Sequence, residues 1–188
     1  MDVLDPDLPL VRRAGAGDAR ACAALVDRHL DGIIGFASRY LGNRADAEEV
    51  AQEVFLRVWR HAASWQPGQA RFKTWLYRVA VNLCHDRARR RPVLPLEDAP
   101  EMISDAPSAS VQLQRDQVSQ QVRRALDALP ERQKSAIVLC YYEEMDNAAA
   151  ADVMDLSVDA LESLLARGRR RLRDLLAAER PNLVGDLE

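Results

Sequence analysis

Residues 157–176 place an apolar side chain at every third or fourth position, which is the pattern of an amphipathic helix with one buried face. The apolar stripe consists of Val158, Leu161, Leu164, Leu165, Leu172, Leu175 and Leu176. The second half of the same stretch carries five arginines: Arg167, Arg169, Arg170, Arg171 and Arg173. Ser157 can cap the helix, because its hydroxyl can accept a hydrogen bond from an amide of the first turn. The stretch therefore predicts a long basic helix that packs its apolar stripe against a partner.

A shorter helix is predicted immediately before it, over residues 147–154. This segment is rich in alanine, so a second helix can approach its backbone closely. Asp155 and Leu156 then break the periodicity and predict a short turn. A short helix, a tight turn and a longer basic helix form a helix-turn-helix, whose second helix can enter the major groove of DNA. The alternative is an ordinary pair of helices with a solvated arginine-rich face, because charge runs on helices often have no other role.

The rest of the chain shows helical periodicity and no alternating strand pattern, so we predict an all-α fold. The expected helices span residues 8–14, 19–41, 46–63, 72–90, 111–129 and 130–142. Asp18 and Asp46 are the expected N-caps of the second and third of these helices. Residues 92–110 contain four prolines among serines and acids, which predicts an extended linker. The predicted architecture is two small helical domains, residues 1–91 and 111–188, joined by a flexible, acidic, proline-containing linker.

The charges are unevenly distributed, although the net charge is only −3. Residues 53–91 carry nine cations against two acids, a net charge of +7, whereas residues 92–110 carry four acids and no cation. Such blocks predict surfaces with different partners. No run approaches the about 20 apolar residues that a membrane-spanning helix needs. The first residues also lack the basic and apolar segments of a signal peptide. We therefore expect a cytoplasmic protein with no membrane insertion.

The three cysteines, Cys22, Cys84 and Cys140, are scattered and odd in number, which does not indicate a disulfide framework. None lies in a CxxC motif, and Cys84 beside His85 is the only adjacent pair with ligand chemistry. The sequence therefore predicts no metal site and no cofactor. A helical enzyme that uses a cysteine with a histidine is the remaining catalytic alternative, but no oxyanion-hole or base-orienting motif accompanies these residues. We predict that the protein is not an enzyme.

Four stretches, taken in order, resemble the sigma-70 family of bacterial transcription factors, and specifically its small extracytoplasmic-function (ECF) group. Residues 46–59, DAEEVAQEVFLRVW, are similar to the family's region 2.2. Residues 72–82, FKTWLYRVAVN, with the arginines at 89–91, are similar to regions 2.3 and 2.4. Residues 128–133, ALPERQ, resemble region 4.1, and residues 157–173 resemble the recognition helix of region 4.2. The resemblance covers about residues 8–176 and implies an alternative sigma factor that directs promoter-specific transcription initiation.

The resemblance implies that the helix beginning near Asp46 binds core RNA polymerase. Glu49, Gln52 and Glu53 follow the spacing i, i+3, i+4 and share one helical face. An acidic, polar strip of this kind, with aromatic residues nearby, suits a basic helical partner. In sigma factors the matching strip, here Asp46, Glu49, Gln52 and Glu53, binds the clamp helices of the β′ subunit. The alternative reading of the same residues is a solvated helix face.

The third long helix combines aromatic rings with cations, which suits unpaired bases that stack on rings while phosphates meet Arg and Lys. By resemblance, it reads the −10 element of a promoter and holds the strand melted, with residues 64–71 forming a pocket for a flipped base. The residues assigned to this role are Trp65, Arg71, Phe72, Lys73, Trp75, Arg78, Asn82, His85, Arg89 and Arg90. Asn82 can offer a donor and an acceptor to a base edge, whereas Phe72 and Trp75 can instead be core residues. The interpretation requires residues 72–91 to be uncovered in the free protein.

By the same resemblance the basic helix of the helix-turn-helix docks in the −35 element. The residues assigned to this contact are Ser157, Val158, Asp159, Glu162, Ser163, Arg167, Arg169 and Arg171. The sequence departs from the family at three positions: Asp155 stands where Gly is usual, and Glu162 and Leu164 stand where cations commonly reach DNA. A carboxylate can accept from cytosine N4 but repels phosphate, so the arginines must supply more of the backbone contact.

The expected partners are those of the ECF group. They are core RNA polymerase, contacted at the β′ clamp helices and the β flap, promoter DNA, and a cognate anti-sigma factor. The acidic linker either threads a polymerase channel or serves as a solubilising spacer, two readings that composition does not separate. A rival interpretation is a helix-turn-helix repressor or activator, which would bind duplex DNA alone and would need a dimerisation face.

Overall fold

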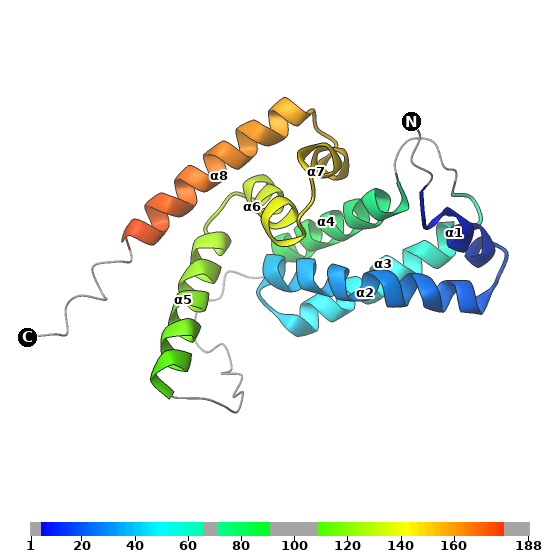
Figure 1. Cartoon of the computed structure of the whole chain (residues 1–188), viewed down its shortest axis with the longest axis horizontal. Coiled ribbons are helices and arrows are strands. Elements are labelled where there is room, and N and C mark those ends of the chain that lie inside the picture. The colour runs from blue at the N-terminus through cyan, green and yellow to red at the C-terminus, as the bar shows by residue number, and fades with distance from the viewer. Residues whose placement is uncertain (1–4, 66–70, 91–108, 179–188) are drawn as a thin grey trace, which may run out of the picture.

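A computed structural model describes residues 5–65, 71–90 and 109–178, with side chains in these ranges except at residues 109–117. Every described element is helical (Figure 1). The first domain consists of α1 (Leu8–Gly15), α2 (Ala19–Leu41), α3 (Arg44–His61) and α4 (Phe72–Arg90). The second domain consists of α5 (Ala109–Asp127), α6 (Glu131–Ile137), the π-helical turn η1 (Val138–Tyr142), α7 (Asn147–Met154) and α8 (Val158–Ala178). The predicted all-α fold with two helical domains is confirmed, while the expected linker lies almost entirely outside the described residues.

Local capping explains where α2 and α3 begin and end. Asp18 caps α2 as predicted, because its carboxylate accepts hydrogen bonds from the amides of Arg20 at 2.9 Å and Ala21 at 3.2 Å. Gly42 ends α2 in the left-handed conformation, with φ of 70°. The prediction that Asp46 caps the next helix is wrong. Asn43 takes that role with an extended backbone and accepts from the amide of Ala45 at 2.8 Å, so α3 begins two residues earlier and Asp46 lies inside its first turn.

The start of the chain ties α2 and α4 together. One carboxylate oxygen of Asp5 accepts from the amide of Phe72 at 2.5 Å and thereby caps α4. The carboxylate of Asp7 is buried, binds His29 at 2.8 Å and pairs with Arg28. Burial lowers the pKa of His29, against the raising effect of the nearby Asp7. The first turn of α4 is therefore capped by a residue that lies 67 positions earlier in the sequence.

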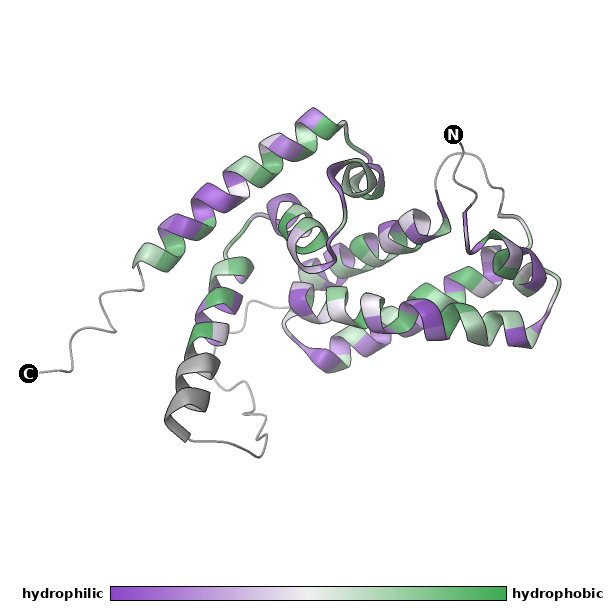
Figure 2. Ribbon diagram, viewed as in Figure 1, coloured by the Kyte–Doolittle hydropathy of each residue, from purple (hydrophilic) through white to green (hydrophobic). Residues whose placement is uncertain are grey.

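The second domain contains the predicted helix-turn-helix. Asp146 caps α7 by accepting from the amide of Ala149 at 2.7 Å, and Asp155 adopts the left-handed conformation that ends it, with φ of 54°. The hydroxyl of Ser157 accepts from the amide of Ala160 at 3.2 Å, as predicted for the cap of α8. Hydrophilic and hydrophobic residues alternate along α8 (Figure 2), whose apolar face packs on α6.

The region predicted as one helix over residues 130–142 is instead α6 followed by η1. The amide of Glu143 donates to the carbonyl of Val138, five residues back, at 3.1 Å, which widens the last turn. Single π-helical turns are rare, and they are frequent at functional sites. Here the wide turn carries Tyr142 and Glu143 toward α2 and α4 of the first domain, because both side chains contact residues of those helices.

The two domains pack directly on each other. Helix α7 contacts α4, and both η1 and α5 contact α2. The buried apolar residues form one cluster that includes Phe36 and Leu76 of the first domain and Leu139 and Val153 of the second. Figure 1 shows the α6–α7 segment lying next to α4. The described helices include none that is both long and apolar enough to span a bilayer.

Candidate nucleic-acid interface

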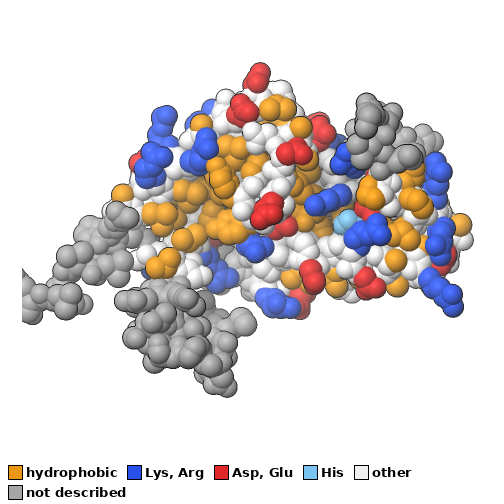
Figure 3. Space-filling view, in the orientation of Figure 1, with side chains coloured by type: hydrophobic (Ala, Val, Ile, Leu, Met, Phe, Trp, Pro, Cys, Tyr) orange, Lys and Arg blue, Asp and Glu red, His pale blue; other side chains and the backbone are white. Residues whose placement is uncertain are grey.

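Helix α8 presents its polar face to solvent. The residues predicted to contact the −35 element are all exposed: Ser157, Val158, Asp159, Glu162, Ser163, Arg167, Arg169 and Arg171. Beneath them Leu161 and Leu165 are buried in the core. Gly168 lets α8 approach α6 closely, because a Cβ at this position would lie 3.2 Å from Ile137. Figure 3 shows Lys and Arg side chains gathered at the upper left, over α8.

Two details adjust the sequence interpretation of α8. Val158 was placed in the apolar stripe, but it is 39% exposed, so the stripe begins at Leu161 and Val158 faces outward. Glu162 accepts a hydrogen bond from the side-chain amide of Asn147 at 3.1 Å, which joins the starts of the two helices of the helix-turn-helix. The carboxylate that departs from the family pattern therefore has a partner within the motif.

The aromatic residues at the start of α4 form a cluster around Phe72. Phe72 is only 1% exposed, so in this arrangement it is a core residue, which is the alternative stated for it. The rings of Trp65 and Trp75 lie 5.8 Å and 5.9 Å from its ring, and both indoles are partly exposed. Arg71 and Lys73 are exposed beside them. The cluster thus offers two accessible indoles and two cations around one buried ring.

A pocket opens between the end of α3 and α4. It measures about 380 Å³ and is lined by Arg57, His61, Ser64, Trp65, Trp75 and Val79. Pockets of this size accommodate small ligands. The sequence interpretation placed the pocket in residues 64–71, of which 66–70 lie outside the described residues. The two residues that α3 contributes were not predicted, because their spacing on α3 gives no sign that they face α4.

The far half of α4 is covered in part by the second domain. The imidazole of His85 binds the Ser135 hydroxyl at 2.8 Å, and Arg89 pairs with Glu131 at 3.0 Å. Arg78 donates to the backbone carbonyl of Asp152. Of the ten residues assigned to the −10 contact, five are exposed: Arg71, Lys73, Asn82, Arg89 and Arg90. The requirement that this surface be uncovered in the free protein is therefore met only in part.

The contact between α4 and α6 shifts the pKa values of His85 and Glu131. Burial lowers the pKa of His85, and Glu131 opposes this effect only partly. The hydrogen bond from Arg89 lowers the pKa of Glu131. The neutral imidazole and the ionised carboxylate are therefore the forms that the contact between α4 and α6 favours.

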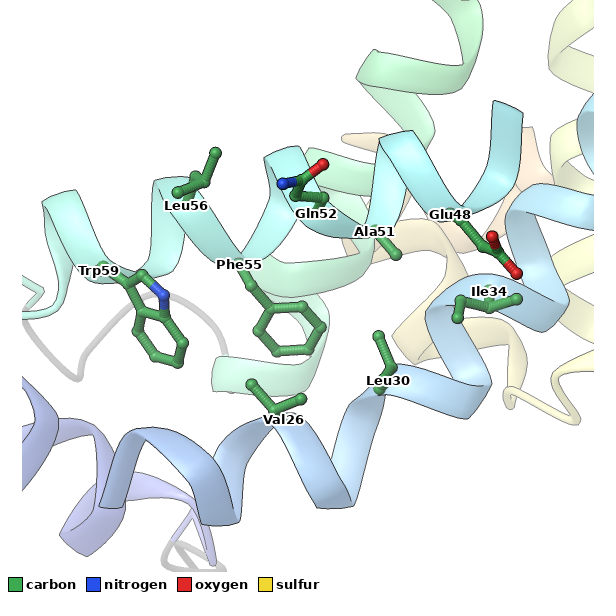
Figure 4. Close-up of a pocket in the computed structure, with 9 residues that line it drawn as sticks. All are labelled: Val26, Leu30, Ile34, Glu48, Ala51, Gln52, Phe55, Leu56 and Trp59. Atoms are coloured by element: carbon green, nitrogen blue, oxygen red, sulfur yellow. The ribbon is translucent and has the colours of Figure 1, made fainter. Parts of the chain in front are cut away.

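An apolar groove lies between α2 and α3 (Figure 4). It measures about 360 Å³ and is lined by Val26, Leu30, Ile34, Glu48, Ala51, Gln52, Phe55, Leu56 and Trp59. Leu56 and Trp59 are 39% and 36% exposed, so two large apolar side chains one helical turn apart reach the surface of α3. Figure 4 shows the Trp59 and Phe55 rings pointing from α3 toward α2. The groove therefore presents apolar surface to a partner.

The acids predicted to bind polymerase share α3 with this groove but do not line it. Asp46 and Glu49 both pair with Arg87 of α4, at 2.7 Å and 2.6 Å, and Glu53 pairs with Arg57 at 3.0 Å. Their charge is thus partly balanced within the first domain.

Of the four predicted residues, Gln52 alone lines the groove, together with Glu48, which the sequence interpretation missed. The helical spacing of Glu48, Gln52, Leu56 and Trp59 was the signal that could have identified this residue.

Comparison with known proteins assigns both domains. Residues 25–92 match the family described as Sigma-70 region 2, and residues 119–172 match Sigma-70, region 4. The chain belongs to the sigma-70 family. Among its relatives, the ECF RNA polymerase sigma factor SigE of Mycolicibacterium smegmatis is 35% identical over 81% of this chain and 60% of that protein. The ECF RNA polymerase sigma factor SigW of Bacillus subtilis is 29% identical over 88% of this chain and 94% of that protein.

Solved structures of sigma factors share the fold. CnrH, in complex with the cytosolic domain of CnrY, is 27% identical with a TM-score of 0.71 over 92% of this chain and 98% of CnrH. RpoE of Bartonella quintana, in complex with the anti-sigma factor NepR, has a TM-score of 0.63 at 21% identity and shows the likeness of fold alone. The protein is an ECF sigma factor, a regulatory subunit that directs RNA polymerase to promoters. Its helix-turn-helix is region 4 of the family, which sets aside the interpretation of an independent repressor.

Proposed function

We propose that three separate surfaces of this sigma factor perform initiation: the groove between α2 and α3 binds polymerase, the start of α4 captures −10 bases, and α8 reads the −35 element. We also propose the boundaries 1–91 and 111–188 for the two binding domains. The observation that carries the proposal is the pocket flanked by Trp65 and Trp75, because it sits beside exposed cations on the helix that matches region 2. The protein acts in the cytoplasm with polymerase and contributes no catalytic group of its own.

Base capture follows from the chemistry of the pocket. An extruded base loses a few kcal/mol of stacking and pairing, and stacking on an aromatic side chain returns about 1–3 kcal/mol. Trp65 and Trp75 supply the ring faces, while Arg57 and His61 supply hydrogen-bond donors at the wall. Arg71 and Lys73 are placed to meet the phosphates that flank the base. Asn82 is exposed further along α4 and is the proposed reader of a base edge.

Polymerase binding follows from the groove. Trp59 and Leu56 provide an apolar anchor, and aromatic anchors in pockets dominate binding energy at protein interfaces. Glu48, Gln52 and the nearby Glu49 provide a polar, acidic rim. An amphipathic helical partner with a basic flank fits this combination, and the β′ clamp helices are the proposed partner. Region 4 would contact the β flap, and a cognate anti-sigma factor would bind the chain, as the cytosolic domain of CnrY binds CnrH.

The experiment combines purified protein with core RNA polymerase and measures transcription over a promoter library. Trp75→Ala should reduce promoter opening by about 10-fold or more, the loss of one stacked base, while leaving polymerase binding intact. Trp59→Ala should instead weaken polymerase binding, measured by fluorescence anisotropy, and lower transcription at every promoter alike. If Trp75→Ala lost polymerase binding and Trp59→Ala lost only promoter opening, the assignment of the two surfaces would be wrong.

A further inference from the structure

We propose that residues 5–15, the N-terminal segment, position the base-capture pocket for −10 recognition by holding both chain segments that carry it. The attachment of this segment rests on contacts in the structure, whereas its consequence for promoter opening rests on the function proposed above. The segment precedes residues 25–92, the part that matches Sigma-70 region 2, and none of its residues lines the pocket. The pocket therefore depends on residues that do not themselves meet a base.

The first attachment is at the start of α4. One carboxylate oxygen of Asp5 accepts from the amide of Phe72 at 2.5 Å, and the other accepts from the amide of Asp7 at 3.0 Å. Phe72 is the first residue of α4, where a helix leaves amides without an intrahelical acceptor and where its dipole favours a negative charge. Such amides are usually capped by the residue just before the helix. Here the cap comes from the start of the chain, so the first turn of α4 is tied to the N-terminal segment.

The second attachment supports the ring around which the pocket's indoles gather. The buried carboxylate of Asp7 binds the imidazole of His29 at 2.8 Å. That imidazole meets the Phe72 ring edge-on, with the ring centres 5.8 Å apart. Phe72 in turn contacts both Trp65 and Trp75. Asp7 therefore holds the group that lies behind the central ring of the aromatic cluster.

The third attachment is at the end of α3, which α1 contacts (Figure 1). A Cβ on Gly15, the last residue of α1, would lie 2.7 Å from the carbonyl oxygen of Ala62 and 2.9 Å from the Cα of Ala63. These are backbone atoms, which cannot move aside as the end of a flexible side chain can. The next two residues, Ser64 and Trp65, line the pocket. The N-terminal segment thus holds the α3 side of the pocket as well as the α4 side.

The two indoles need such support because they come from separate elements. Trp65 follows the end of α3, whereas Trp75 lies in the first turn of α4. Their separation is therefore set by how these two chain segments are held. Binding groups act well only when they are kept within about 0.5 Å of the productive geometry. A preformed pair of rings also reduces the ordering that a captured base would otherwise have to impose.

The first test measures the accessibility of the two indoles in the full-length protein, without polymerase or DNA. The sequence holds three tryptophans, so the variant Trp59→Phe leaves only Trp65 and Trp75 as fluorophores for acrylamide quenching. Adding Asp5→Ala should raise the quenching constant, because the first turn of α4 loses its cap. Asp5→Asn keeps an oxygen that can accept from the Phe72 amide and should restore the original value.

Two further variants separate positioning from a general loss of charge or fold. The matched control Asp31→Ala removes an exposed carboxylate of α2 and should leave quenching unchanged. Gly15→Ala removes no hydrogen bond but pushes α1 away from the end of α3, so it should raise quenching as Asp5→Ala does. Circular dichroism checks that each variant is folded. An unchanged quenching constant in Asp5→Ala or Gly15→Ala would overturn the attachment that the variant removes.

The second test measures promoter opening by the complete polymerase complex, using promoters that the unmodified protein selects from a library. Permanganate reactivity of unpaired thymines reports the open complex. Asp5→Ala should lower opening about 5-fold, which corresponds to about 1 kcal/mol, the typical effect of a lost N-cap. Asp5→Asn should recover opening, and polymerase affinity should stay the same in both variants.

The outcomes distinguish this proposal from the function on which it rests. Raised quenching with unchanged opening would overturn the role of the N-terminal segment in −10 recognition. A loss of opening that Asp5→Asn shares, or a loss of polymerase affinity in Asp5→Ala, would overturn the capping role of Asp5. If instead Trp75→Ala left opening unchanged, the proposed function of the pocket would be refuted.

Discussion

Helices α4 and α8 are both arginine-rich and both were predicted to contact DNA, but the chain treats them differently. On α4, Arg78, Arg87 and Arg89 all bind oxygens of the protein itself. On α8, Arg169 is the only arginine with a hydrogen bond among the described residues, and its partner is the neutral hydroxyl of Tyr141. Three arginines of α4 are therefore paired with oxygens of the protein, whereas the arginines of α8 are exposed to solvent.

The difference shows that charge in the sequence does not by itself define a binding surface. A run of arginines on α8 remains exposed because the apolar stripe beneath it already fixes the helix on α6. Arg78 and Arg89 of α4 lie where the two domains meet, so their partners come from residues 74 and 42 positions away, whereas Arg87 pairs with Asp46 inside the first domain. The chain thus leaves the proposed −35 helix exposed, whereas the proposed −10 helix is exposed only in part.

The largest expected effect tests the two faces of α8. Leu161→Ala removes a fully buried side chain and should lower the free energy of unfolding by about 2–5 kcal/mol. The matched control Val158→Ala truncates a residue that is 39% exposed and should change it by less than about 0.5 kcal/mol. Urea unfolding followed by circular dichroism gives both values. Equal losses would mean that α8 does not lie in the described orientation.

The next effect concerns the packing of α2 against Tyr77 of α4, which a glycine substitution can disturb without a change of charge. Gly32→Ala pushes a methyl group into the Tyr77 hydroxyl and should separate the two domains. The separation should lower the energy transfer between two fluorophores attached at the exposed positions Ala45 and Ala128, one in each domain. Gly35→Ala, one turn later, meets only the end of the flexible Arg39 side chain at 2.9 Å and should retain most of the transfer. Both changes favour the helix equally. The prediction fails if the two variants behave alike.

A smaller effect tests whether the exposed arginines of α8 bind DNA phosphates. Arg171→Ala should reduce the slope of log affinity against log salt by about 1 for a 30-base-pair DNA duplex, because one phosphate contact is lost. Arg12→Ala, an exposed arginine of α1 in the other domain, serves as the control and should leave the slope unchanged. Anisotropy titrations at several salt concentrations measure both. An unchanged slope for Arg171→Ala would remove that residue from the DNA contact.

The smallest expected effect is a pH dependence of the packing between the two domains, which arises from His85. Burial lowers the pKa of His85 when the two domains are packed together, so the packed arrangement binds fewer protons than one in which the domains are apart. Acidification below the ordinary histidine pKa of about 6.5 should therefore favour opening, and energy transfer should fall between about pH 7 and pH 5.5. Glu131 stays ionised in this window, because Arg89 lowers its pKa.

The other groups around His85 are Ser135, Tyr40, Asp86, Arg89 and Arg132. His85→Gln keeps a hydrogen-bonding side chain but cannot take up the proton, so its energy-transfer profile should be flatter than that of the unmodified chain. A steep fall in the Gln variant would assign the pH dependence to another group.

Much of the fold could be predicted because its signals are local. Asp18 and Ser157 cap helices through amides two or three residues away, and Gly42 ends α2 by its own conformation. The error at Asp46 has the same origin, since Asn43 is also a good cap and lies three residues earlier. The turn η1 was not predicted, because a π-helical turn and an α-helix share nearly the same apolar spacing over five residues.

The covering of α4 could not be predicted, because it depends on tertiary contacts. Nothing in the sequence around His85 indicates that Ser135 will lie 2.8 Å away. The α3 wall of the groove could be predicted from the spacing of aromatic residues on that helix. The other wall, which comes from Leu30 and Ile34 of α2, could not. Sequence patterns therefore predicted the helices to which the function is assigned, and the structure shows which of their described residues are exposed.

The most direct test of the whole interpretation follows energy transfer between positions 45 and 128 while saturating core RNA polymerase is added. We predict high transfer in the free sigma factor and a clear loss on formation of the complex, because the −10 surface must be uncovered before it meets a promoter. High transfer that persists in a complex that initiates transcription would contradict the interpretation.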